Sequence, residues 1–172
     1  MKTKYHAPRV LHWPGNRQSG VTLGRGYDMG RRHSGDIVST LKQAGIEEYK
    51  AIICSKAAFL KGNDAEQFVK VYGPLVGEIT HQQQKRLFEI SYREKSQYAQ
   101  RLYATNQLSP PWMILDRKVQ DVVVDIIYQG FHHIDALFRA AAGGKRELAA
   151  FIMSDSGLMS FEANRKRIRY LR

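Results

Sequence analysis

Cysteine is nearly absent from the sequence, and so are long apolar segments. The 172 residues include one cysteine, Cys54, which excludes an intramolecular disulfide. No apolar run approaches the roughly 18 residues that a membrane span requires. The basic N-terminus has no apolar core behind it, so we expect no Sec signal peptide. These absences predict a protein made in the cytoplasm, with no membrane span.

Acidic residues are missing from the start of the chain. Residues 1–27 contain no acid, and the whole chain has 27 Lys and Arg against 16 Asp and Glu, a net charge of +11. Such a bias favours an anionic partner: nucleic acid, an acidic membrane surface or an acidic cell-wall polymer. Specific nucleic-acid binding is disfavoured, because neither a groove-reading helix nor aromatic–basic interleaving is recognisable. Bases are densest near the C-terminus, at Arg165, Lys166, Arg167, Arg169 and Arg172.

The composition, 43% hydrophobic and 25% charged, is that of a globular α+β protein long enough to bury a core. Glycines alternating with apolar residues over 19–30 predict a β-hairpin. We expect one monomeric domain over 1–172, with a β-hairpin lobe at 1–33 and a helical lobe at 34–172. Apolar periodicity predicts helical segments at 34–44, 46–60, 63–72, 81–104, 115–130, 133–142, 145–153 and 161–171.

Helix boundaries have their own signals. Ser34 is a candidate N-cap, and Gly73-Pro74 is expected to end the third helical segment. Thr80 and Gln83 have the spacing of a capping box at the start of the longest helix. The segment after Leu115 is the most apolar of the chain and is the predicted core helix.

Two motifs near the N-terminus carry a family resemblance. Trp13-Pro-Gly15 precedes the string Ser19-Gly-Val-Thr-Leu-Gly-Arg-Gly-Tyr-Asp-Met-Gly30. Together they resemble the signature of the phage-type lysozymes, in particular the pesticin-like branch of bacterial toxin homologues. Asp125-Ile-Ile-Tyr-Gln-Gly130 and Asn164-Arg-Lys-Arg-Ile-Arg169 are similar to that family's central and closing helices. The resemblance implies a lysozyme-like fold.

The resemblance also implies an activity: hydrolysis of the β-1,4 bond between N-acetylmuramic acid and N-acetylglucosamine in peptidoglycan. Asp28 would position or activate water, and Thr22 would assist it. Asn16 lies six residues before Thr22, where the simple phage enzymes carry an Asp, and as an amide it can hold water but not act as a base. No cofactor or metal is implied.

Three aromatic or amide residues complete the candidate site, each with a plain structural alternative. Tyr27 is expected to contact sugar or to pack in the core. Tyr128 is expected to form a wall of the cleft or part of the core. Gln129 is expected to hydrogen-bond an N-acetyl or hydroxyl group, or to cap the helix end before Gly130.

The family's general acid is a Glu on a helix before the hairpin, and no acid precedes Asp28 in this sequence. Three interpretations stay open: a truncated product that has lost its first helix, a non-catalytic relative that binds cell wall, or a distant Glu. The formal candidates are Glu47, Glu48, Glu78, Glu89, Glu94, Glu147 and Glu162. An endolysin, a bacteriocin or a secreted effector would each act on the bacterial wall after release or delivery, with peptidoglycan and anionic surface polymers as partners.

Overall fold

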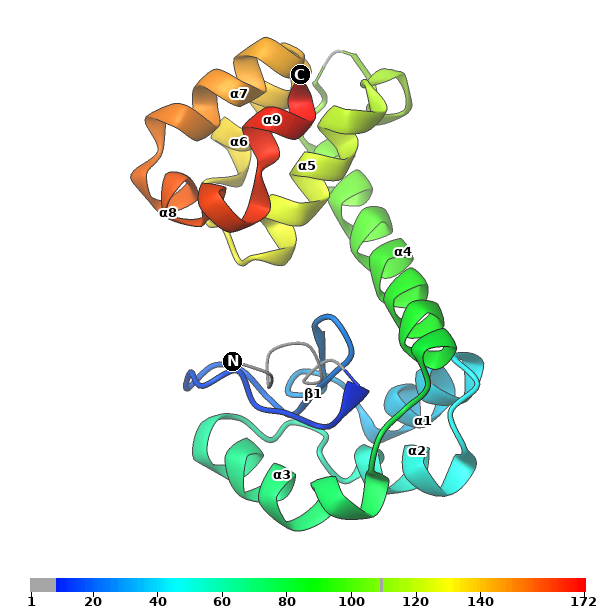
Figure 1. Cartoon of the computed structure of the whole chain (residues 1–172). Coiled ribbons are helices and arrows are strands. Elements are labelled where there is room, and N and C mark those ends of the chain that lie inside the picture. The colour runs from blue at the N-terminus through cyan, green and yellow to red at the C-terminus, as the bar shows by residue number, and fades with distance from the viewer. Residues whose placement is uncertain (1–8, 109) are drawn as a thin grey trace. The chain divides into compact units, whose positions relative to one another are not determined.

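The computed structural model describes residues 9–108 and 110–172, and Figure 1 shows its elements. The chain divides into two compact units, one ending at Arg93 and the other beginning at Glu94. The described residues are mostly helical, and the first unit contains a two-stranded antiparallel hairpin, so the α+β prediction is confirmed. The hairpin is grouped with the helices up to residue 93, and the unit boundary lies inside a helix. The single domain over 1–172 stays a prediction.

The hairpin consists of β1 (Thr22–Leu23) and β2 (Tyr27–Asp28), as predicted for this region. Thr22 pairs with Asp28, and Leu23 pairs with Tyr27. The connecting loop has Gly24 at φ 63° and Gly26 at φ 98°, a region of backbone space that glycine enters without strain. Isolated bridges extend this strip, pairing His12 with Thr22 and Gly20 with Lys61.

From residue 9 onward, the first unit also contains three α-helices and the start of a fourth: α1 (Ser34–Gln43), α2 (Glu48–Ser55), α3 (Gly62–Val76) and α4 (His81–Thr105). Helix α1 packs against α2, and α2 against α3. The inward side chains of the hairpin join those of the helices in one buried cluster, which includes Val21, Leu23, Tyr27, Met29, Ile37, Leu41 and Phe68. The hairpin is therefore a packed part of this core.

Two predicted helix boundaries were wrong, and one was confirmed. The N-cap of α1 is His33, and Ser34 is the first helical residue. Helix α3 continues to Val76 although Pro74 lacks a backbone N–H. Gly77, at φ 66°, closes the helix by donating to the Gly73 carbonyl. The capping box is present: Thr80 N–H donates to Gln83 Oε1 (2.8 Å), and Gln83 N–H donates to Thr80 Oγ1 (3.0 Å).

The second unit contains the end of α4 and a cluster of helices. These are the 3₁₀ turn η3 (Trp112–Ile114), α5 (Arg117–Tyr128), α6 (Ile134–Ala142), α7 (Lys145–Ser154), α8 (Ser156–Arg165) and α9 (Arg167–Leu171). Helix α5 packs against α6, α7 and α9, and it buries Val119, Val122, Val123 and Ile126, as its spacing predicted. Within 9–108 and 110–172, no helix has both the length and the apolar character of a membrane span.

The predicted helix over 161–171 is two helices. Lys166 adopts left-handed backbone angles (φ 52°, ψ 36°), which ends α8 and redirects the chain into α9. Glu162 stabilises this break, because its Oε1 accepts a hydrogen bond from the Ile168 N–H at 2.7 Å. Periodicity continues across such a break, so the sequence pattern does not reveal it.

Candidate functional site

The hairpin brings the two predicted catalytic residues together. Thr22 and Asp28 are directly opposite each other on β1 and β2. Cross-strand partners project from the same face of a sheet, with Cβ atoms roughly 5 Å apart. The six-residue spacing in the sequence is therefore the spacing of a tight hairpin with a three-residue loop.

Backbone amides hold the Asp28 carboxylate in place. Gly20 N–H lies 3.1 Å from Oδ1 and 3.2 Å from Oδ2, and Gly30 N–H donates to Oδ1 at 2.7 Å. A carboxylate has about four lone-pair sites, so these two donors leave acceptor capacity on Oδ2. Asp28 is half-buried. The arrangement fixes the carboxylate and still allows it to accept a hydrogen bond from water.

The two glycines that hold Asp28 leave no room for side chains. A Cβ on Gly20 would lie 2.5 Å from Gly30 Cα and 2.7 Å from Asp28 Oδ1. A Cβ on Gly30 would lie 3.0 Å from the same carboxylate oxygen. Glycine is therefore required at positions 20 and 30, because the backbone approaches the carboxylate closely there. This requirement explains two of the glycines in the glycine-rich string.

Thr22 acts on Asp28 through Gly20. Its side chain is 2% exposed, and its hydroxyl donates to the Gly20 carbonyl at 3.1 Å. The Gly20 N–H in turn donates to Asp28, so Thr22 holds the residue whose amide positions the carboxylate, through the next peptide along the chain. Direct contact between the Thr22 hydroxyl and a substrate water would require this buried group to be uncovered.

A histidine that the sequence did not single out flanks Thr22 on the other side. His12 and Thr22 exchange both backbone hydrogen bonds, at 2.9 and 2.8 Å, so they are opposite each other across a second strand pair. The His12 ring is partly exposed, and its Nδ1 lies 2.9 Å from the Val10 carbonyl oxygen. No motif marks His12, because its relation to Asp28 depends on pairing.

Tyr27 lies in the core of the first unit. Its side chain is 1% exposed, which agrees with the packing alternative, and a sugar contact would require the ring to become exposed. The Arg32 guanidinium lies 4.2 Å from the centroid of this ring, and Arg32 Nε donates to the Asp28 carbonyl at 3.0 Å. Arg32 therefore fixes β2 from the side of the aromatic ring, a role that its sequence position after Gly30 did not reveal.

Asn16 is exposed and shapes the loop before the hairpin. Its Oδ1 accepts hydrogen bonds from the amides of Gln18 (3.0 Å) and Ser19 (2.8 Å), an Asx-type turn. The Trp13 indole N–H lies 3.1 Å from the carbonyl oxygens of both Asn16 and Ser19. The side-chain oxygen of Asn16 is thus used in the turn, and Trp13 secures the segment that leads into Gly20.

The other two predicted residues, Tyr128 and Gln129, belong to the second unit and lie at the end of α5. Lys95 Nζ is 5.3 Å from the centroid of the Tyr128 ring. Gln129 is the C-cap of α5, and its Oε1 accepts a hydrogen bond from Arg167 Nη2 at 2.5 Å. The capping alternative for Gln129 is therefore present in the structure, and its amide oxygen is engaged by an arginine.

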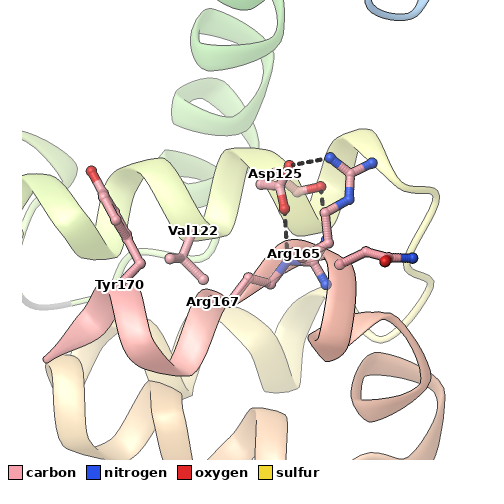
Figure 2. Close-up of a pocket in the computed structure, with 6 residues that line it drawn as sticks. Val122, Asp125, Arg165, Arg167 and Tyr170 are labelled. Atoms are coloured by element: carbon pink, nitrogen blue, oxygen red, sulfur yellow. Dashed lines mark hydrogen bonds and ion pairs between the residues drawn. The ribbon is translucent and has the colours of Figure 1, made fainter. Parts of the chain in front are cut away.

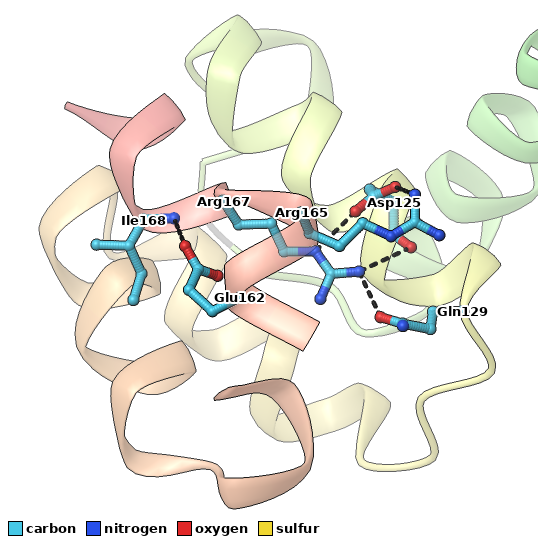
Figure 3. A network of polar contacts seen from close by, with 6 residues as sticks. All are labelled: Asp125, Gln129, Glu162, Arg165, Arg167 and Ile168. Carbon is cyan, nitrogen blue, oxygen red and sulfur yellow. Dashed lines mark hydrogen bonds and ion pairs between the residues drawn. The ribbon is translucent and has the colours of Figure 1, made fainter. Parts of the chain in front are cut away.

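Arg167 is the centre of a polar network, drawn in Figure 3. Its side chain is 2% exposed, and its Nε donates to Asp125 Oδ2 at 2.7 Å. Arg165 Nη1 lies 3.3 Å from Oδ1 of the same carboxylate. These groups lie at a cavity of about 240 Å³, lined by Val122, Asp125, Asn164, Arg165, Arg167 and Tyr170. Figure 2 shows five of the lining residues with labels. The network joins α5 to α9 through residues about 40 positions apart in the sequence.

Among the described residues of the first unit, no glutamate hydrogen-bonds or ion-pairs with Thr22 or Asp28. Glu78 pairs with Arg9 at 3.4 Å. A hydrogen bond to its own backbone amide lowers the pKa of Glu47, the opposite of what a general acid needs. The candidate glutamates of the second unit include Glu162, whose Oε1 is engaged at the α8–α9 break.

Cys54 is buried, and as the single cysteine of the sequence it is free. Burial raises the pKa of its thiol to about 12, so the group stays protonated at neutral pH. This protonation state excludes Cys54 as a ready nucleophile.

The chain belongs to a family described as a domain of unknown function, DUF8812, which matches residues 1–159. This match covers the whole hairpin and the helices as far as the first residues of α8. No match to the chain is found among curated proteins.

Proposed function

We propose that this protein is a lysozyme-like muramidase, a glycoside hydrolase that cleaves the β-1,4 bond between N-acetylmuramic acid and N-acetylglucosamine in peptidoglycan. The observation that carries the proposal is the Thr22–Asp28 cross-strand pair, with the Asp28 carboxylate held by the amides of Gly20 and Gly30. The glycine-rich string that resembles the pesticin-like signature is the segment that builds this arrangement.

Asp28 supplies the water-activating half of the reaction. Its remaining acceptor site on Oδ2 takes a hydrogen bond from a water molecule, and the carboxylate accepts a proton as that water attacks the anomeric carbon. Thr22 keeps the carboxylate in position through Gly20. The reaction also needs a proton donor at the leaving oxygen, which this pair does not provide.

Substitution of Asp28 tests the proposal. Asp28→Asn keeps the size of the side chain and removes the base, so reducing-end release from purified peptidoglycan should fall at least about 100-fold. Asp36→Asn is the matched control, because Asp36 is an exposed acid of α1 in the same unit. Circular dichroism confirms that each variant is folded. Equal release by wild type and Asp28→Asn would contradict a catalytic role for Asp28.

A second candidate function is non-catalytic binding of cell wall. The burial of Thr22 and the absence of a glutamate beside Asp28 in the described first unit favour this alternative. It predicts retention on insoluble peptidoglycan without any release of reducing ends. Release that depends on Asp28 would contradict it, and the absence of both retention and release would contradict both candidates. In either case the protein would act as a monomer on the bacterial wall, after release or delivery.

A further inference from the structure

Three side chains form a row across the strands of the first unit. Thr22 is the middle member, paired with His12 on one side and with Asp28 on the other. Residues opposite each other in antiparallel strands project from the same face of the sheet, so all three side chains share one face. The outer two are half-buried and the middle one is buried. A titratable side chain therefore lies on each side of Thr22.

The spacing of the outer two residues follows from the hydrogen-bond pattern. His12 and Thr22 exchange both backbone hydrogen bonds, which places their Cα atoms roughly 5.5 Å apart. Since the Thr22 amide and carbonyl face His12, the pair with Asp28 is of the non-hydrogen-bonded kind, roughly 4.5 Å between Cα atoms. His12 and Asp28 are thus about 10 Å apart at the backbone. In inverting glycosidases the carboxyl groups of the acid and the base, which are side-chain ends and not backbones, are roughly 6.5–9.5 Å apart, and this separation leaves room for the attacking water.

We propose, on the basis of the proposed function, that His12 is the proton donor of the reaction, in the role for which a glutamate is expected. The imidazolium Nε2–H gives its proton to the glycosidic oxygen as the bond from that oxygen to the anomeric carbon breaks. A water molecule forms the new bond to the anomeric carbon and loses its proton to Asp28. The net reaction adds one water molecule across the glycosidic bond. The proton then returns from Asp28 to His12 through solvent.

The hydrogen bond of the His12 ring fixes which nitrogen acts. The Val10 carbonyl can only accept, so Nδ1 carries a proton and donates to it at 2.9 Å. This bond is present in both the imidazolium and the neutral ring, because the proton that leaves is the one on Nε2. The ring therefore keeps its orientation through the proton transfer, as positioned acid–base groups require.

Leaving-group dependence separates a proton donor from a structural residue. Peptidoglycan has a sugar hydroxyl as leaving group and needs protonation, whereas a 2,4-dinitrophenyl chitooligosaccharide releases a stable anion without it. His12→Gln should lose roughly 100-fold or more on peptidoglycan and stay within about threefold of wild type on the aryl substrate. Asp28→Asn should lose activity on both. Added imidazole should restore His12→Ala on peptidoglycan.

The matched control is His81→Gln, since His81 is an exposed histidine at the start of α4. Its activity should equal that of wild type on both substrates. If His12→Gln keeps the wild-type rate on peptidoglycan while Asp28→Asn does not, His12 is not the donor and the proposed function stands. Equal losses on both substrates without rescue by imidazole would show a structural role and overturn the proposal. Inactive wild type on both would overturn the proposed function together with it.

Discussion

At the scale of single residues, the candidate site depends on the absence of side chains as much as on their presence. The Asp28 carboxylate is bound by backbone N–H groups, which can approach it because residues 20 and 30 have no Cβ. A polar side chain in place of these amides would have brought rotamer freedom with it. The backbone clamp therefore orients the carboxylate at little cost in conformational entropy.

Gly20→Ala should disturb this clamp. Its Cβ would come within 2.5 Å of Gly30 Cα, so the strip must shift, at a cost of about 2 kcal/mol in the free energy of unfolding. Hydrogen exchange of peptides from 9–32 measures the loss directly. The matched control is Gly35→Ala, where a Cβ meets no atom within 4 Å and alanine should stabilise α1 by about 0.5 kcal/mol. Unchanged exchange in Gly20→Ala would show that the close approach does not constrain the hairpin.

At the scale of elements, local signals were predictable and long-range ones were not. The capping box at Thr80, the hairpin and the core helix α5 were confirmed, because each depends on residues close together in the sequence. The end of α3 at Gly77, past Pro74, and the break at Lys166 each fall at one residue with a positive φ, which apolar periodicity does not encode.

The same distinction explains what was missed in the candidate sites. The family resemblance implied Thr22 and Asp28, and the hairpin places these two residues opposite each other. The alignment of His12 with this pair requires a second strand pairing, and the bonds from Arg167 to Asp125 join residues 42 positions apart. The sequence shows the C-terminal run of bases only as a bias in charge, and it does not reveal that Arg167 within this run is buried.

The short helix α9 should depend on Arg167 for its attachment to α5. Arg167→Gln removes the buried guanidinium that binds Asp125 and Gln129, and it should lower the free energy of unfolding of the second unit by about 3 kcal/mol. Faster hydrogen exchange in peptides from α5 and α9 would report this loss. Arg169→Gln removes the same charge from an exposed position of α9 and should change stability by less than about 0.5 kcal/mol. Equal effects of the two substitutions would mean that only charge, and not the buried network, matters.

At the scale of the whole molecule, charge is the dominant property. The net charge is +11, and residues 1–27, in which the candidate site begins, contain bases and no acid. A cationic surface around a site raises the local concentration of polyanions, and this effect weakens as salt screens it. Bacterial walls that carry anionic polymers are polyanions of this kind, whereas chitin presents related sugars without the negative charge. Comparing the two separates attraction by charge from recognition of sugar.

Retention on intact walls should therefore depend on salt. The Debye length falls from roughly 10 Å at 0.1 M to about 3 Å at 1 M, so the fraction bound to purified walls should drop roughly tenfold between 0.05 and 0.5 M NaCl. Walls stripped of anionic polymers should bind less at low salt, and chitin should bind least. Asp28→Asn, which alters the candidate site and not the basic surface, should be retained like wild type in every case. If retention were the same at both salt concentrations, or chitin bound as well as intact walls, the charge would not be what brings this protein to the wall.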